Sequence, residues 1–249
     1  MRKIKDIYYT SKKNEMQMLD MYLPDEDGFP VFVFFHGGGL EHGDRTHCQC
    51  PASYLAPRGV GLISVEYRMY PNAKYPDYIE DAALAVKWVF DNIQSYGGNG
   101  KIFVGGSSAG GYLSMMLCFD ESFYRAVGLP SSAISGYIHD AGQPTVHFKV
   151  LEERGVDPRR CIIDDAAPLY HIGLREKYPP MLFIYSDRDM ECRPEQIELT
   201  VATLKHFGMN PSDIEVVKMS GTHCEYCGKM EDGESVHGKI MYPFIKRHA

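Results

Sequence analysis

The stretch KIFVGGSSAGG, residues 101–111, decides how we interpret this chain. A short apolar run leads into two glycines and two serines, and residues that favour a buried helix follow. The pattern Gly106-x-Ser108-x-Gly110 is typical of a sharp strand-to-helix turn that exposes a serine hydroxyl at the carboxyl end of a sheet. Glycines are needed on both sides because a side chain there would collide with neighbouring backbone. The stretch therefore predicts a nucleophilic Ser108.

Two serines are adjacent in this stretch, so the register of the turn matters. Ser108 has glycine two residues before it and two residues after it. Ser107 has Gly105 before it but Ala109 after it. We therefore assign the nucleophile to Ser108 and keep Ser107 as the alternative. The free amides at the start of the following helix would face developing negative charge.

Apolar strands alternate with helical segments along most of the chain, which is typical of α/β architecture. The segment 137–178 fits neither the helical nor the strand period. We expect it to be an excursion between two strands that lies over the active site. Phe90 and Phe207 are expected on buried helix faces.

A chain of 249 residues is expected to form one domain, 1–249. Strands are expected at 16–23, 31–35, 61–65, 102–104, 181–185 and 214–217, and helices at 78–93, 108–119, 194–207 and 234–247.

The segment HGGG, residues 36–39, directly follows the strand expected at 31–35. Consecutive glycines let the backbone approach a substrate and aim N–H groups at a developing oxyanion. The expected donors of this oxyanion hole are the backbone N–H groups of Gly38, Gly39 and Ala109. The sequence leaves open whether Gly37 replaces one of them.

A serine hydroxyl attacks only when a base takes its proton, and a carboxylate normally orients that base. In chains with this type of turn the order is serine, acid, histidine. Asp189 stands in the turn after the strand expected at 181–185, and Asp187 is the alternative acid. We expect Asp189 to be the acid because it lies further into the turn.

The expected base is His223, which stands on the loop after the strand expected at 214–217. Two other histidines are less well placed. His237 falls within the expected last helix, and His171 precedes the acid in the chain. The predicted catalytic residues are therefore Ser108, Asp189 and His223.

Composition narrows the class of protein. The formal net charge of −7 argues against nucleic acid or an anionic membrane surface as the main partner. We find no apolar run that would make a signal peptide or a membrane span, so a cytoplasmic location is expected. The seven cysteines form an odd set, which does not suggest a disulfide framework.

Two cysteine pairs follow the motifs already described. Cys48 and Cys50 come after the HGGG segment, and Cys224 and Cys227 come after His223. Four converging thiols could bind zinc or form a reversible disulfide. The spacing is not a standard zinc pattern, so incidental thiols are the simplest interpretation and no metal site is assigned.

With these motifs in place, the chain resembles the bifunctional feruloyl and acetylxylan esterase type among the carbohydrate-active α/β-hydrolases. It is more distantly similar to hormone-sensitive-lipase-like esterases. The resemblance implies the α/β-hydrolase fold, a mostly parallel central sheet flanked by helices, and a structural pair between Arg68 and Asp81. Only 35 residues precede the HGGG segment, so no large cap domain is expected. The matching stretches are 19–24, 36–39, 65–68 and 75–81, the serine turn, Asp189 and His223.

The resemblance implies a serine carboxylesterase that hydrolyses short-chain acyl esters. Acetyl esters of xylan or mannan oligosaccharides are the leading substrates, and the mechanism needs no cofactor. The expected partner is a small-molecule or oligosaccharide ester, without nucleic acid or membrane, and a homo-oligomer stays open. The alternatives are a feruloyl esterase, an aryl formamidase-like amidase, and a non-catalytic binding module that kept the fold. The sequence does not fix the acyl-chain length or the alcohol.

Overall fold

A computed structural model describes residues 1–175 and 177–249 of the chain. Its centre is an eight-stranded sheet in the order β1-β2-β4-β3-β5-β6-β7-β8. The pairs β1–β2 and β2–β4 are antiparallel, and the other neighbours are parallel. The strands are β1 (Arg2–Tyr8), β2 (Met18–Leu23), β3 (Phe29–Phe35), β4 (Gly61–Val65), β5 (Gly98–Ser107), β6 (Ile134–Asp140), β7 (Met181–Arg188) and β8 (Ile214–Thr222).

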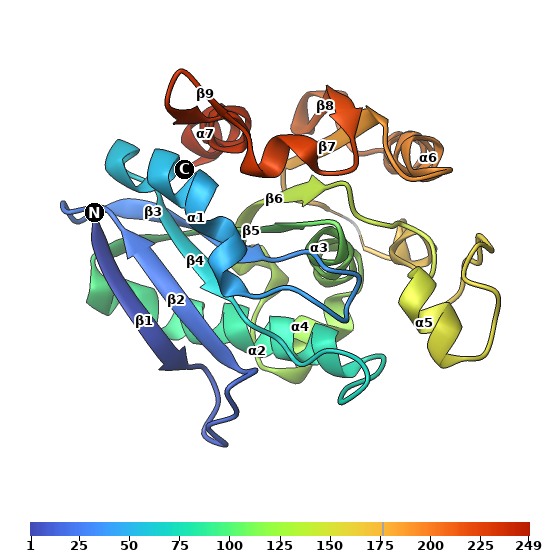
Figure 1. Ribbon diagram of the computed structural model, residues 1–249, viewed down its shortest axis with the longest axis horizontal. Coiled ribbons are helices and arrows are strands. Elements are labelled where there is room, and N and C mark those ends of the chain that lie inside the picture. The colour runs from blue at the N-terminus through green and yellow to red at the C-terminus, as the bar shows by residue number, and fades with distance from the viewer. Residues whose placement is uncertain (176) are drawn as a thin grey trace.

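Helices cover both faces of this sheet (Figure 1). One core cluster joins the sheet to α2 (Asp77–Asn92), α3 (Ala109–Phe119), α4 (Glu121–Ala126) and α6 (Arg193–His206). A second cluster joins the opposite face to α1 (Gln49–Leu55) and α7 (Val236–His248). A short helix, α5 (Phe148–Glu153), and a two-stranded ribbon of β9 (Met230–Glu231) and β10 (Glu234–Ser235) complete the described α-helices and strands.

The central strand β3 shows why the sheet is buried on both sides. Val31, Val33 and Phe35 belong to the cluster with α2 and α3. Phe32 and Phe34 point the other way, into the cluster with α1 and α7. Side chains alternate between the faces of a strand, so a continuous apolar run can satisfy both layers. All seven residues of β3 are buried.

The expected strands and helices are present, with boundaries that differ by a few residues. Residues 1–35, all of which are described, contain β1, β2 and β3 and no helix. No described helix combines the length and apolar character that crossing a bilayer requires.

The predicted excursion at 137–178 starts too early. Its first four residues belong to β6 (Ile134–Asp140), a strand that the sequence did not reveal. This strand ends in His139 and Asp140, two polar residues that are nevertheless buried, so it lacks the apolar pattern of its neighbours. The remainder holds α5 and a short 3₁₀ helix at Pro168–His171, and residue 176 lies outside the described residues.

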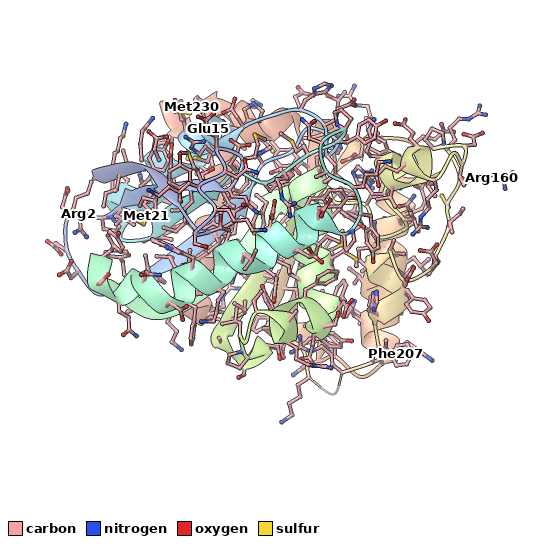
Figure 2. All side chains as sticks on the ribbon, turned by 90° about the horizontal axis from the view of Figure 1, so that it is seen from below. Arg2, Glu15, Met21, Arg160, Phe207 and Met230 are labelled. Atoms are coloured by element: carbon pink, nitrogen blue, oxygen red, sulfur yellow. The ribbon has the colours of Figure 1, made fainter. Side chains whose placement is uncertain are left out.

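The prediction that Phe90 and Phe207 are buried is wrong. Phe90 is 41% exposed and Phe207 is 56% exposed. Phe207 follows the last residue of α6 and lies at the periphery of the molecule, where its ring covers Gly173 (Figure 2). The helical period does not place Phe207 correctly because the helix has already ended there.

The turn between β5 and α3 demands glycine for a measurable reason. A Cβ at Gly110 would lie 1.9 Å from the carbonyl oxygen of Phe35, and one at Gly106 would lie 2.4 Å from the same oxygen. Both distances are far inside van der Waals contact, so the start of α3 can pack on β3 only without side chains there. The clash expected from the sequence is confirmed.

We predict that Gly110→Ala lowers the free energy of unfolding by about 3 kcal/mol or more, because the added methyl group has no space. Gly228→Ala is the matched control. A Cβ there meets nothing within 4 Å, so the change should stay below about 1 kcal/mol. Urea unfolding followed by circular dichroism measures both. Equal stability of the two variants would contradict the packing described here.

Candidate active site

Three side chains from separate turns meet at the carboxyl edge of the sheet. The Oγ of Ser108 lies 2.8 Å from Nε2 of His223. The Nδ1 of the same ring lies 2.5 Å from Oδ1 of Asp189. Ser108 sits between β5 and α3, Asp189 directly follows β7, and His223 directly follows β8. Parallel strands end at the same edge of the sheet. This is why Ser108 and His223 are neighbours although they are 115 positions apart in the chain.

Ser108 has the strained backbone that the turn imposes. Its φ of 56° and ψ of −113° lie outside the conformations that non-glycine residues usually adopt. A hydrogen bond from its backbone N–H to the carbonyl of Asp140, at 2.8 Å, holds the turn against β6. The hydroxyl is thereby directed out of the sheet edge and toward His223.

Asp189 is held by several hydrogen bonds. Its side chain is fully buried, and it accepts from the backbone N–H groups of Ser186 at 3.2 Å and Met190 at 2.7 Å. Burial by itself would raise the pKa of this carboxyl group, but the hydrogen bond to His223 and the backbone N–H groups lower it below its usual value. The carboxylate therefore accepts from Nδ1–H of His223, which leaves Nε2 free to accept the proton of Ser108.

Asp187, the alternative acid, has a different role. It is exposed, and its Oδ1 accepts from the backbone N–H of Gly221 at 2.9 Å, which lowers its pKa. This contact ties the ends of β7 and β8 together. Among the described contacts, Asp187 makes none with His223.

The alternative serine and histidines also lie elsewhere. The Oγ of Ser107 donates to Oδ2 of Asp140 at 2.5 Å, so this hydroxyl faces the core. His171 places Nε2 2.9 Å from the carbonyl of Asp165. His237 places Nε2 3.1 Å from Oδ2 of Asp140. Among the described residues, none of these three side chains hydrogen-bonds to Ser108.

The HGGG segment lies beside Ser108. Gly38 has a φ of 123°, and a Cβ there would lie 1.8 Å from the carbonyl oxygen of His42. Gly37 packs directly on the serine turn, since its Cβ would lie 3.0 Å from the carbonyl oxygen of Ser107. Among the described residues, no acceptor receives the backbone N–H of Gly38, Gly39 or Ala109. The same is true of the backbone N–H of Gly37, so the choice of Gly38, Gly39 and Ala109 as oxyanion donors stays a prediction.

Buried polar side chains support the HGGG segment, and sequence reasoning assigned them no role. His36 places Nε2 3.0 Å from Oε1 of Glu66 and Nδ1 2.8 Å from the carbonyl of Gly37. Its ring stacks on Tyr67 with centroids 4.5 Å apart. The Oε2 of Glu66 accepts from the backbone N–H of Arg45 at 3.2 Å. The only signal was the stretch 65–68, which matched relatives without indicating a partner for His36.

The expected pair between Arg68 and Asp81 is present. Nε of Arg68 lies 2.8 Å from Oδ2 of Asp81, and the Arg68 Nη2 lies 2.8 Å from Oδ1. Gln17 also donates to this buried carboxylate at 2.6 Å. The pair fastens the segment after β4 to α2, and Gln17 joins the residue just before β2 to the same carboxylate.

A cavity of about 490 Å³ opens beside Ser108 and His223. Phe148 of α5 lines it, so one residue of the predicted excursion reaches the candidate site. The Sγ of Cys224 lies 3.7 Å from Nε2 of His223. The lining residues outside the three-residue constellation are Phe34, Gly37, Gly38, Gly39, His47, Ser107, Phe148, Met190, Cys224, Cys227, Gly228 and His237.

A larger cavity of about 710 Å³ adjoins the first and shares Phe148 and Met190 with it. Its remaining lining is mainly polar and charged. The residues are Gln143, Glu152, Asp157, Pro158, Arg159, Arg160, Cys161, Glu191, Cys192, Arg193 and Gln196.

The four thiols of the two cysteine pairs do not form one group, although the thiols of Cys224 and Cys227 are in contact. Cys50 contacts Ser235, with Sγ to Oγ at 3.2 Å. The Sγ of Cys48 donates to the carbonyl of Arg45 at 3.2 Å. Within the described residues, the group with ligand atoms close enough to hold a metal consists of Asp140, Cys227 and His237. Of the four cysteines in the two pairs, Cys227 is the one that belongs to this group.

Comparison with known proteins gives a consistent picture of the fold. The family model described as BD-FAE matches residues 19–136. Esterase LipC from Mycobacterium tuberculosis is 30% identical over 214 residues, which cover 76% of this chain and 52% of LipC. The chain spans about half, or less, of the length of the curated relatives it matches.

Two solved structures resemble nearly the whole chain. Esterase B from Lactobacillus rhamnosis has a TM-score of 0.80 at 15% identity, covering 99% of this chain and 85% of that one. A truncated carbohydrate esterase from gut microbiota has a TM-score of 0.80 at 17% identity, covering 100% and 96%. These similarities and the mostly parallel sheet show that the chain has the α/β-hydrolase fold.

We predict that Glu66→Gln lowers the free energy of unfolding by about 2 to 4 kcal/mol, because it removes the buried charge that faces His36 and Arg45. Glu80→Gln, on the exposed side of α2, is the matched control and should leave stability unchanged. Thermal unfolding measures both variants. A Glu66→Gln protein as stable as the wild type would show that this pair does not support the HGGG segment.

Proposed function

We propose that this chain is a serine carboxylesterase that hydrolyses short-chain acyl esters, with Ser108 as nucleophile, His223 as base and Asp189 as the orienting acid. One observation carries the proposal. A continuous hydrogen-bonded chain runs from the Ser108 hydroxyl through both ring nitrogens of His223 to the buried carboxylate of Asp189. Such a relay is what an unactivated hydroxyl needs to attack a carbonyl carbon at neutral pH.

The proposed reaction has two steps. Nε2 of His223 takes the proton of Ser108 as Oγ bonds to the ester carbonyl carbon, and the resulting imidazolium gives that proton to the departing alcohol. The acyl group then remains on Ser108. A water molecule loses a proton to the same nitrogen and attacks the acyl carbon. The bond between that carbon and Oγ then breaks as the imidazolium returns the proton to Ser108, and the carboxylic acid is released. Throughout, the Asp189 carboxylate holds Nδ1–H and stabilises the imidazolium.

The oxyanion would form against backbone donors. The N–H groups of Gly38, Gly39 and Ala109 have no acceptor among the described residues. Gly38 and Gly39 line the same cavity as Ser108, and Ala109 directly follows Ser108 in the chain. Each such donor is typically worth about 3 kcal/mol of transition-state stabilisation. Because backbone groups on a glycine turn are already fixed, they cost little reorganisation when the charge develops.

We propose acetyl esters of carbohydrates, such as xylan or mannan oligosaccharides, as the substrate class. Both cavities support this choice. Phe148 and Met190 line the pocket beside Ser108 and give it apolar walls that can hold a short acyl group. The adjoining cavity offers Arg159, Arg160 and Asp157, which suit the hydroxyl groups of a sugar. Two similar proteins are named an esterase and a carbohydrate esterase, in line with this proposal.

The nucleophile is tested with p-nitrophenyl acetate. We predict that Ser108→Ala lowers turnover by about 10⁴-fold or more, because no other described hydroxyl faces His223. Ser107→Ala is the control, since this hydroxyl faces Asp140, and it should retain most of the activity. Activity that survives in Ser108→Ala and disappears in Ser107→Ala would overturn the assignment.

The acid is tested by a pair of neighbouring substitutions. We predict that Asp189→Asn lowers kcat by about 10⁴-fold, because an amide can stabilise the wrong tautomer of His223 and cannot stabilise the imidazolium. Asp187→Asn keeps an oxygen acceptor for Gly221 and should leave kcat near the wild-type value. Steady-state kinetics on the same ester compares them. A larger loss in Asp187→Asn would contradict the geometry.

The substrate class is tested by direct product analysis. We predict that the wild type releases acetate from acetylated xylo- or manno-oligosaccharides, while Ser108→Ala does not. Methyl ferulate and N-formylkynurenine serve as comparison substrates for a feruloyl esterase and an aryl formamidase. A kcat/KM on either comparison substrate that exceeds the value on acetylated oligosaccharides would reject the carbohydrate deacetylation part of the proposal.

A further inference from the structure

A second chemical cluster lies directly behind the serine turn. Asp140 ends β6 and is 1% exposed. Its Oδ2 lies 3.1 Å from Nε2 of His237 and 3.3 Å from Sγ of Cys227. One ligand atom from each of the three residues lies within 4.8 Å of the others. The esterase mechanism uses none of these side chains.

His237 supplies an independent sign that a ligand belongs there. The residue is 1% exposed, and its Nε2 lies 3.1 Å from Oδ2 of Asp140 in an ion-pair contact that lacks the angles of a hydrogen bond. Buried nitrogen atoms almost always have a partner, so an exception calls for an explanation. A metal ion between His237 and Asp140 would satisfy this nitrogen.

The donor set and spacing fit zinc. A thiol, an imidazole and a carboxylate are the ligand types that Zn²⁺ combines. Zinc bonds of about 2.0 to 2.3 Å in a tetrahedron place neighbouring ligand atoms about 3.3 to 3.7 Å apart. The observed separations of 3.1 Å and 3.3 Å need only small outward movements. Hard oxygen-seeking ions such as Mg²⁺ and Ca²⁺ would not favour the thiol.

The surroundings suit a metal site as well. Cys227 and His237 line the cavity beside Ser108, so an ion could enter from solvent and keep a water as its fourth ligand. The hydroxyl groups of Ser107 and Tyr226 both donate to Asp140 and would orient its carboxylate. Such supporting hydrogen bonds are typical around metal ligands.

We propose that Asp140, Cys227 and His237 bind one Zn²⁺ ion next to the serine turn. On binding, the Cys227 thiol loses its proton to solvent and the thiolate sulfur coordinates the ion. The ion would connect the segment Glu225–Gly228, just after His223, to β6 and α7. Zinc therefore stabilises the loop that carries the proposed base, and this site stands whether or not the chain is an esterase.

Metal stoichiometry tests the proposal directly. Cys161 and Cys192 are exposed and their thiols are in contact, so the experiment uses a Cys161→Ser/Cys192→Ser background to remove a competing thiol pair. This protein is stripped with a chelator, given a small excess of zinc sulfate and desalted. Mass spectrometry of the metal content should then find one zinc per chain.

Matched variants identify the ligands. We expect Cys227→Ser and His237→Asn to lose the zinc, while Cys50→Ser, whose thiol lies against Ser235, keeps it. Cobalt in place of zinc should give a thiolate-to-cobalt absorption band that is absent in Cys227→Ser. In the background protein, zinc at about 100-fold its Kd should raise the melting temperature by roughly 5 to 10 °C.

Two results would overturn the site. The first is a stripped background protein that takes up no stoichiometric zinc. The second is a folded Cys227→Ser protein that binds zinc as well as the control does. Circular dichroism of each apo variant establishes that it is folded, and Cys227→Ser decides the question if His237→Asn does not fold. Esterase activity is not needed for any of these measurements.

Discussion

The carbonyl oxygen of Phe35 lies where side chains at Gly106 and Gly110 would have to be. This close approach joins the end of β3 to the start of α3, and it brings the HGGG segment against the serine turn. The strained φ of Ser108 follows from it, because the chain must reverse within one residue between β5 and α3. One packing constraint therefore positions both the proposed oxyanion donors and the proposed nucleophile.

Asp140 holds the same turn from the other side. Its backbone carbonyl accepts from the N–H of Ser108, and its carboxylate accepts from the hydroxyl of Ser107. The two adjacent serines are thus separated in function by geometry: one hydroxyl faces the core and the other faces His223. A buried carboxylate with several donors is stabilising only if each donor stays in place, which makes β6 a structural support for the proposed site.

Much of the fold and of the candidate site could be predicted because parallel strands end at one edge. Apolar runs identified most central strands, and each residue at issue came just after one of them. The choice of Asp189 over Asp187 depended on a two-residue step in a turn. The structure shows why that step matters: only Asp189 turns inward to His223, while Asp187 caps Gly221.

The features that escaped prediction depend on contacts between distant residues. His36 and Glu66 are 30 residues apart, and nothing local in either segment indicates their pairing. Asp140 stands at the end of β6, where buried polar residues replace the apolar pattern that would indicate a strand. Cys227 and His237 were considered separately, as one of four thiols and as a helix residue, because spacing alone cannot show that β6 brings a carboxylate between them.

Covalent labelling would show whether Ser108 is the activated nucleophile. The protein would be treated with a fluorophosphonate, digested, and analysed by tandem mass spectrometry to locate the phosphonylated residue. We expect one adduct per chain, on Ser108, and none when His223 is replaced by alanine. An adduct on Ser107, or no adduct on a folded protein, would contradict it.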